Sequence, residues 1–235
     1  MSGNGFSRQT LLDYAASERG AFETTLREIV EIPTISVDPA RREDCARGAE
    51  YAAALVRRMG GEATIIQTKG HPIVAGLFQR NASWPTVTVY NHLDVQPAER
   101  EDGWNTEPFQ FTSEDGRYFA RGTTDDKGPA MTALWGAKYA LDNGARVNVK
   151  LLWETEEEIG SPNFETTIRA EKERFATDSV IVSDTVWVSR ARPACPAGLR
   201  GLQGFRFTLE TGKTDQHSGT SGGAARNPIT ELCQL

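Results

Sequence analysis

The chain has 235 residues, of which 38% are hydrophobic and 25% charged, an ordinary globular composition that suits one large domain or two small ones. Its net charge of -6 argues against nucleic acid as the main partner. No stretch approaches the roughly 18 consecutive apolar residues of a transmembrane helix, so we expect no membrane association.

The first third of the chain predicts two helices followed by strands. Apolar residues recur at helical spacing over 9–31, which predicts an amphipathic helix that Pro33 ends. A second helix is predicted over 42–59, with Gly60-Gly61 as its stop. Short runs rich in β-branched residues predict strands at 63–67, 73–78 and 86–90.

The middle of the chain alternates between predicted helices and predicted strands. The pair Asp115-Gly116 predicts a hairpin turn. Helices are predicted over 127–141 and 162–175, the second capped by Ser161. Strands are predicted over 147–153 and 180–182. This alternation predicts an α/β fold with a mainly parallel central sheet.

The composition changes after Arg190. Residues 192–198 contain two prolines and a glycine and are typical of a linker. Residues 204–210 alternate between apolar and polar side chains, which predicts a half-buried antiparallel strand, and Pro228 opens a predicted helix. We therefore expect a first domain over 1–198 and the beginning of a second over 199–235.

Cysteine usage and the N-terminal residues bear on the cellular compartment. The three cysteines, Cys45, Cys195 and Cys233, are far apart and form no Cys-x-x-Cys pair. The first residues lack an apolar segment of signal-peptide length. These features predict reduced thiols and a cytoplasmic protein.

Polar side chains of related chemistry follow the ends of the apolar strands. These residues are His92, Asp94, Asp125, Glu156, Glu157, Glu158 and Asp184. Ligands of open α/β sheets bind at the carboxyl ends of the strands, and converging carboxylates repel unless they share a proton or bind a cation. An acidic run such as 154–158 is by itself more often a solvated surface. The convergence of several strand ends favours a site for Zn²⁺, Mn²⁺ or Co²⁺.

Four spaced segments carry a family resemblance. YNHLDVQP at 90–97, RGTTDDKGP at 121–129, EEIGS at 157–161 and SD at 183–184 resemble the metal-binding motifs of the M20 metallopeptidases. This family includes carnosinase-like dipeptidases, aminoacylases and carboxypeptidase G relatives. DQHSG at 215–219 resembles the start of its lid domain. The resemblance implies a zinc-exopeptidase-like catalytic domain, followed by the start of an α+β lid or dimerisation domain.

The resemblance also implies a metal centre with two zinc ions. Asp125 would bridge the two ions. His92 and Asp184 would complete one site, and Glu158 would serve the other. Mn²⁺ or Co²⁺ could replace zinc in such a ligand set.

Three further residues receive catalytic roles from the resemblance. Glu157 would be the general base that takes a proton from the attacking water and passes it to the leaving amine. Asp94 would orient His92. His217 would reach from the lid into the partner subunit's site and hold the substrate in a homodimer. The Asp125-Asp126 peptide bond is often cis in the family.

The sequence also departs from the family pattern. Family members run to roughly twice this length, and a histidine near their C-terminus completes the second metal site. The only histidines of this chain are His71, His92 and His217, and we read His71 as structural. The sequence therefore predicts a fragment of such an enzyme, truncated at the C-terminus, with little or no peptidase activity of its own.

The function expected by resemblance is metal-dependent hydrolysis of a peptide bond beside a free carboxylate, as in a dipeptidase. Deacylation of N-acyl amino acids is an alternative, because it also breaks an amide next to a carboxylate. The second alternative is a non-catalytic metal-binding or interaction module. A serine hydrolase is disfavoured: GTSGG at 219–223 matches the nucleophile-elbow pattern, but no histidine follows it.

Overall fold

The computed structural model describes residues 6–184, 189, 191–192, 194–198 and 200–234. It separates into two units, Met1–Cys195 and Pro196–Leu235. The predicted start of the second domain, residue 199, lies outside the described residues, as do residues 1–5 and Pro193 of the predicted linker. The assignment of the two segments as catalytic and lid domains stays a prediction. Among the described residues, every helix is too short or too polar to cross a bilayer.

The first unit is built on a five-stranded sheet with the order β1-β2-β6-β3-β7. Its strands are β1 (Glu62–Ile66), β2 (Ile73–Phe78), β3 (Thr86–His92), β6 (Asn148–Glu154) and β7 (Ser179–Val182). Strand β3 pairs in parallel with both β6 and β7, whereas β2 pairs antiparallel with both β1 and β6. Four strands therefore share one direction and β2 alone opposes them, which confirms the mainly parallel α/β sheet.

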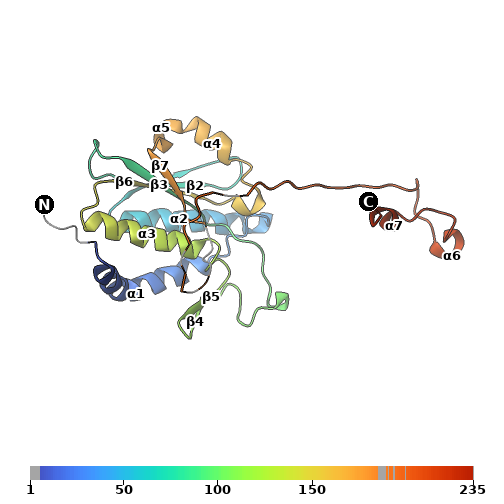
Figure 1. Ribbon diagram of the computed structural model, residues 1–235, viewed down its shortest axis with the longest axis horizontal. Helices are drawn as coiled ribbons and strands as arrows, with labels where there is room; N and C mark the ends of the chain where they lie inside the picture. The colour runs from blue at the N-terminus through green and yellow to red at the C-terminus, as the bar shows by residue number, and fades with distance from the viewer. Residues whose placement is uncertain (1–5, 185–188, 190, 193, 199, 235) are drawn as a thin grey trace. The chain divides into compact units, whose positions relative to one another are not determined.

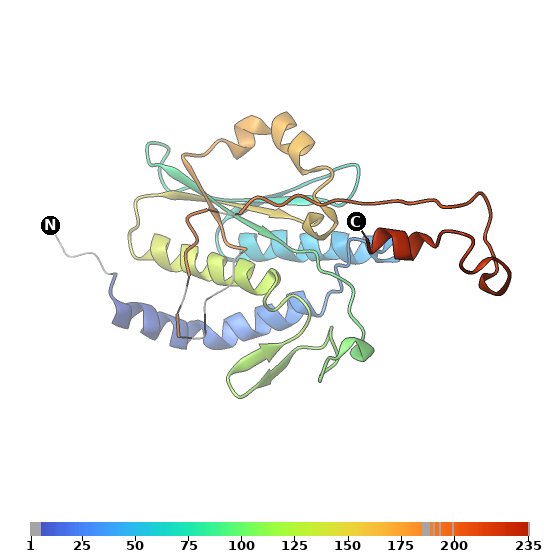
Figure 2. The ribbon, with the colours of Figure 1, turned by 45° about the vertical axis from the view of Figure 1, so that its right-hand side comes forward.

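Helices cover both faces of this sheet (Figure 1). Below it in that view lie α2 (Arg42–Arg58) and α3 (Lys127–Asp142), and α1 (Arg8–Val30) packs against α3 on the side away from the sheet. Above it lie α4 (Phe164–Ala170) and α5 (Lys172–Phe175), and Figure 2 shows the same layers from another side.

The main core lies between the sheet and the three long helices. Its fully buried members include Ile29 and Val30 of α1, Ala52 and Val56 of α2, Met131 and Leu134 of α3, and Val74, Leu151 and Trp153 of the strands. Burial of one such large apolar side chain stabilises the fold by about 1.5–3 kcal/mol. This packing holds the carboxyl ends of the central strands in place.

The remaining short elements join these layers. They are the 3-10 helices η1 (Pro39–Arg41), η2 (Arg100–Asp102) and η3 (Glu157–Ile159), and the hairpin of β4 (Thr112–Glu114) with β5 (Arg117–Phe119). The predicted hairpin turn is confirmed. Both Asp115 and Gly116 have positive φ angles, 50° and 68°, as a tight two-residue turn requires.

The helix predicted over 162–175 is interrupted, and its predicted cap is wrong. Ser161 has a φ of 51°, and its amide donates to the carbonyl of Glu156, so it belongs to the turn that closes η3. The helix begins later, with Asn163 at the N-cap of α4, and Glu171 separates α4 from α5. The local conformation of the acidic turn therefore overrides the Ser-Pro capping pattern.

The second unit contains α6 (Ser218–Ser221) and α7 (Pro228–Leu232) among its described residues. The predicted helix at Pro228 is confirmed, with Asn227 as its N-cap. The predicted strand over 204–210 is wrong: none of the described residues pairs with it, and Phe205 and Phe207 are 77% and 71% exposed. Apolar alternation produces a stable strand only where a neighbour supplies hydrogen bonds and an apolar face.

Candidate metal centre

The candidate centre lies where the parallel strands β3, β6 and β7 end. His92 is the last residue of β3, and Asp184 follows β7 by two residues. Glu157 follows the end of β6. Asp125 comes from the loop that precedes α3. Parallel strands end at one edge of the sheet, so residues distant in sequence meet there.

His92, Asp125 and Asp184 each offer one ligand atom, and these atoms lie within 4.8 Å of one another. His92 Nε2 is 2.9 Å from Asp125 Oδ1 and 3.8 Å from Asp184 Oδ2. Zinc bonds of about 2.0–2.2 Å to nitrogen and oxygen place ligand atoms at comparable mutual distances. One imidazole and two carboxylates, at this spacing, therefore fit a divalent cation such as Zn²⁺.

Asp94 lies on the far side of the His92 ring from the ligand group. His92 Nδ1 is 3.0 Å from the carbonyl oxygen of Asp94 and 3.4 Å from its Oδ1. Both neighbours accept hydrogen bonds, so Nδ1 carries a proton, and Nε2 is the ring nitrogen that remains for a metal ion. This arrangement supports the orienting role predicted for Asp94, which stays a prediction.

The carboxylate of Asp94 is fully buried and accepts hydrogen bonds from two further chain segments. The amides of Glu157 and Glu158 donate to its Oδ1 and Oδ2, each over 3.1 Å, and Ser36 Oγ donates to Oδ2 over 2.6 Å. Asp94 therefore connects the end of β3 with the acidic turn after β6.

The acidic turn separates the two glutamates to which different roles were assigned. Glu157 Oε2 lies 4.0 Å from His92 Nε2, beside the ligand group. Glu158 is not part of that group, and its Oε2 accepts a hydrogen bond of 2.9 Å from Gln96. The two residues lie in the 3-10 helix η3 and not in extended chain. In a 3-10 helix, successive side chains are rotated by about a third of a turn, so the two side chains point in different directions. The ligand role of Glu158 stays a prediction.

Asp125 and Asp126 are joined by a cis peptide bond, as the resemblance implied. The Asp125 side chain is 62% exposed at the site, whereas Asp126 is fully buried. Asp126 Oδ2 accepts hydrogen bonds from Asn91 Nδ2 at 2.8 Å and from the His92 amide at 3.1 Å. Asp126 thus connects the loop that carries Asp125 to the strand that carries His92.

Lys127 is a further part of this framework that sequence reasoning missed. Its ammonium group is fully buried and donates to the carbonyls of Ile29 and Ile32, at 3.0 and 2.7 Å. A lysine directly after two aspartates gives no local sign of burial. The contact joins the start of α3 to the end of α1 across more than 90 residues.

Burial and mutual repulsion favour protonated groups in the metal-free cluster. Burial raises the pKa of Glu157 and of Asp184, and His92 partly opposes both shifts. Burial likewise raises the pKa of Asp126 to about 7. Burial alone would lower the pKa of His92, but its hydrogen bond to Asp94 and the surrounding carboxylates raise it to about 10. A bound cation would displace protons from the side-chain atoms that ligate it.

Two other glutamates of the acidic run are buried supports rather than solvated groups. Glu154 Oε1 accepts from the hydroxyl of Tyr90 at 2.6 Å. Glu156 Oε1 accepts from the His71 amide at 2.9 Å and from Asn163 Nδ2 at 3.1 Å. His71 is buried, which agrees with the structural role expected for it.

His217 lies in the second unit and is described within it alone. It is the N-cap of α6, and its Nδ1 accepts a hydrogen bond of 3.0 Å from the amide of Gly219. Its predicted role in holding substrate across a dimer stays a prediction.

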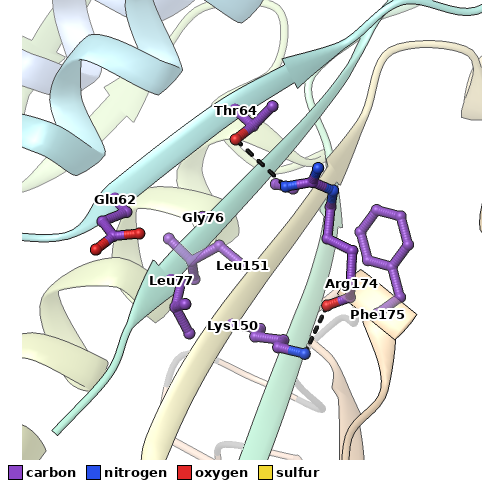
Figure 3. Close-up of a pocket in the computed structure, with 9 residues that line it drawn as sticks. Glu62, Thr64, Gly76, Leu77, Lys150, Leu151, Arg174 and Phe175 are labelled. Atoms are coloured by element: carbon purple, nitrogen blue, oxygen red, sulfur yellow. Dashed lines mark hydrogen bonds between the residues drawn. The ribbon is translucent and has the colours of Figure 1, made fainter. Parts of the chain in front are cut away.

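A surface pocket lies away from this chemistry. Figure 3 shows it against β1, β2, β6 and α5, with Lys150 and Arg174 among its lining residues. Lys150 Nζ donates to the carbonyls of Arg174 and Ala176, at 2.5 and 2.6 Å, so its ammonium group holds the end of α5. None of the candidate site residues lines this pocket.

The comparisons with known proteins agree with the geometry. Residues 88–212 match the model of peptidase family M20/M25/M40, and the chain belongs to this family. It is 35% identical to the Cys-Gly metallodipeptidase dug1 of Schizosaccharomyces pombe, over 97% of this chain and 51% of the relative. It is 33% identical to the human Beta-Ala-His dipeptidase, over 97% of this chain and 48% of the relative. The chain thus spans about half the length of the curated relatives it matches.

Solved structures of the family have the same fold. The di-peptidase Dug1p of Saccharomyces cerevisiae matches 96% of this chain and 51% of its own, with a TM-score of 0.74 and 26% identity. Human carnosine dipeptidase 1 matches 95% of this chain and 50% of its own, with a TM-score of 0.73 and 30% identity. These similarities confirm the M20 metallopeptidase resemblance and its α/β catalytic fold.

Proposed function

We propose that this chain carries the metal-dependent hydrolytic site of a dipeptidase, which cleaves a peptide bond next to a free carboxylate. The observation that carries the proposal is the ligand group of His92, Asp125 and Asp184, with Glu157 beside it at 4.0 Å from His92 Nε2. The names of the relatives, a Cys-Gly metallodipeptidase and a Beta-Ala-His dipeptidase, support dipeptides as the substrate class.

Zinc is the proposed metal, and Mn²⁺ or Co²⁺ would also suit the nitrogen and oxygen donors. His92, Asp125 and Asp184 would hold one ion. Asp125 would also contact a second ion, together with Glu158. When bound, such ions lower the pKa of water and polarise the carbonyl of the scissile bond.

The side chains of the chain itself would orient the ligands and move the proton. Asp94 would keep the proton of His92 on Nδ1. Glu157 would take a proton from the attacking water and deliver it to the nitrogen of the leaving amine, so the carboxylate is regenerated after each cycle. Burial raises the pKa of Glu157, which makes it a better acceptor for that proton.

The deciding experiment measures amine release from Cys-Gly and β-Ala-His by the purified chain, with Zn²⁺, Mn²⁺ or Co²⁺ and after chelation. We expect little or no hydrolysis, and none without metal, because His92 is the one imidazole in the ligand group found among the described residues. An N-acetyl amino acid serves as a second substrate, and its faster hydrolysis would favour a deacylase. Release above the uncatalysed rate that persists unchanged after chelation would contradict the proposal.

Metal stoichiometry separates an enzyme from a non-catalytic module. Two ions per chain, measured by atomic absorption after gel filtration, would support the two-metal site of a hydrolase. One ion or none would support a non-catalytic module instead.

We further propose that the whole protein is a cytoplasmic homodimer that associates through the segment after residue 198. Three free thiols support a reducing compartment. Exposed apolar side chains at Phe205 and Phe207 support association through this segment. Sedimentation velocity of the purified chain tests the dimer, and a monomer at all concentrations would contradict it for this chain.

A further inference from the structure

Ser36 is a buried serine outside the motifs that define the metal centre. Its hydroxyl donates to Asp94 Oδ2 over 2.6 Å, in an environment where both side chains are almost completely buried. A hydrogen bond from a hydroxyl to a buried carboxylate is stronger than one between neutral groups. Ser36 lies in the loop between α1 and α2, 58 residues away from Asp94 in the sequence.

The backbone of Ser36 is held in turn by His71. His71 Nε2 lies 3.1 Å from the carbonyl oxygen of Ser36. A carbonyl only accepts hydrogen bonds, so Nε2 carries the proton and donates it. The amide of His71 donates to Glu156 Oε1 over 2.9 Å. Glu156 directly precedes Glu157, whose amide donates to Asp94 Oδ1.

These contacts close a ring. It runs from Asp94 to Ser36, His71, Glu156 and the amide of Glu157, and back to Asp94. Its members come from the α1–α2 loop, the turn between β1 and β2, the end of β3 and the turn after β6. This ring of hydrogen bonds therefore includes the backbone of Glu157, the predicted general base, and the carboxylate of Asp94, which faces His92.

A second set of contacts holds the Ser36 loop against the end of β3. Thr34 Oγ1 donates to the carbonyl of Leu93 at 2.5 Å, and the amide of Val95 donates to the carbonyl of Thr34 at 3.0 Å. Both residues 34 and 36 are buried. The Ser36 hydroxyl is thus presented to Asp94 by a backbone that is itself fixed.

We propose that Ser36 is a positioning residue of the metal centre that acts through Asp94 and is held in place by His71. The proposal rests on the proposed function, since it concerns the same site. The Ser36 hydroxyl sets the rotation of the Asp94 carboxylate. That rotation determines whether Oδ1 and Oδ2 meet the amides of Glu157 and Glu158 and the Nδ1 side of His92.

The first test is zinc binding by isothermal titration calorimetry on the folded chain. We expect Ser36→Ala to weaken zinc affinity by about tenfold, at the lower end of the 10–100-fold range typical of residues that orient ligands. Thr177→Val is the matched control. It removes a hydroxyl that donates to the carbonyls of Thr86, at the start of β3, and of Ser179, at the start of β7, and we expect unchanged affinity.

A double-mutant cycle separates positioning from a general loss of stability. In an Asp94→Asn background the partner of the Ser36 hydroxyl is altered, so Ser36→Ala should weaken zinc binding further by less than about twofold. An unchanged affinity in Ser36→Ala, or a full tenfold loss in both backgrounds, overturns the proposal. If the wild-type chain binds no zinc, the proposed function fails, and hydrogen exchange then decides whether Ser36 positions Asp94.

Hydrogen exchange of the metal-free chain provides a readout that needs neither metal nor activity. We expect Ser36→Ala to accelerate exchange of the amides of Glu157 and Glu158, which donate to Asp94. Amides in the middle of α2 and of α3 serve as the internal reference for folding. Unchanged exchange in the acidic turn, with the reference helices intact, contradicts the proposal.

Discussion

The chemistry of single residues in this protein depends strongly on their burial. Glu157 and Glu158 are neighbours in the chain, yet Glu157 lies beside His92 and Glu158 is bonded to Gln96. Cys45 is fully buried, whereas Cys195 and Cys233 are exposed. Residues of the same type therefore differ in reactivity, and two predictions follow at this scale.

Replacement of Glu157 by glutamine should abolish proton transfer while leaving the ligand group intact. We expect metal-dependent dipeptide hydrolysis to fall by about 10²–10⁴-fold, or to the level of the chelated protein. Zinc affinity should stay close to that of the wild type. The control is Glu165→Gln on α4, where the side chain is 77% exposed. Retained hydrolysis in Glu157→Gln would remove Glu157 as the base.

The thiol of Cys45 should be inert in the native chain. Burial, with a smaller effect from Asp94, raises its pKa to about 12, so little reactive thiolate forms at pH 8. With a thiol-specific chromogenic disulfide, we expect rapid labelling of Cys195 and Cys233, and labelling of Cys45 only after denaturation. Cys45→Ala should leave the rapid phase unchanged. Native labelling of Cys45, located by peptide mapping, would disprove its burial.

At the scale of elements, the start of α3 determines where the loop of Asp125 lies. The amide of Gly128 donates to the carbonyl of Gly122 over 3.1 Å, which brings the helix close to the preceding loop. A Cβ added at Gly128 would lie 1.9 Å from the carbonyl oxygen of Thr123. The glycine is therefore needed for the close approach of two backbones.

Gly128→Ala should displace this loop and weaken both folding and metal binding. We expect a loss of about 1–3 kcal/mol in the free energy of unfolding, as for other overpacked sites. Gly136→Ala, in the same helix, is the control. Nothing lies within 4 Å of a Cβ at that position, so alanine should stabilise α3 by about 0.5–1 kcal/mol. Urea unfolding of both variants measures the two changes in the free energy of unfolding, which should have opposite signs. Changes of the same sign and size would contradict the close packing at Gly128.

For the molecule as a whole, the titratable groups of the candidate metal centre make stability depend on pH. His92, Asp126, Asp184 and Glu157 all have raised pKa values in the folded chain. Each binds its proton more tightly when folded. Each therefore contributes stability that is present below its unfolded pKa and is lost as the pH rises through its folded pKa.

The metal-free chain should thus become less stable as the pH rises. For Asp126 the loss extends from its ordinary pKa of 3.8 to about 7, and for His92 from 6.5 to about 10. We expect the Tm of the chelated protein to fall between pH 4 and pH 7. Above pH 7 the pKa of Lys127, which burial lowers to about 7, acts in the opposite direction to that of His92. Zinc should raise the Tm by an amount that grows with pH, because ligation requires deprotonated groups. A Tm that is flat or rising between pH 4 and pH 7 in the chelated chain would contradict this expectation.

Several features of the fold were predictable from the sequence because their causes are local. The strand 73–78 and the α2 and α3 helices follow from hydrophobic spacing and from stop signals next to them. Asp115-Gly116 determines its own turn. The expectation for Ser161 was wrong because its conformation depends on the carbonyl of Glu156 rather than on the helix that follows.

The amino-acid sequence by itself determined the α/β alternation, the M20 membership and the residues at the strand ends, because each depends on neighbours along the chain. Only the tertiary structure decided how Asp94 is held and which residues hold it. Ser36, Asn91, His71 and Lys127 reach their partners across 35 to 98 residues, and no pattern along the chain encodes such contacts. Their hydrogen bonds form only when packing excludes water and brings separate segments together.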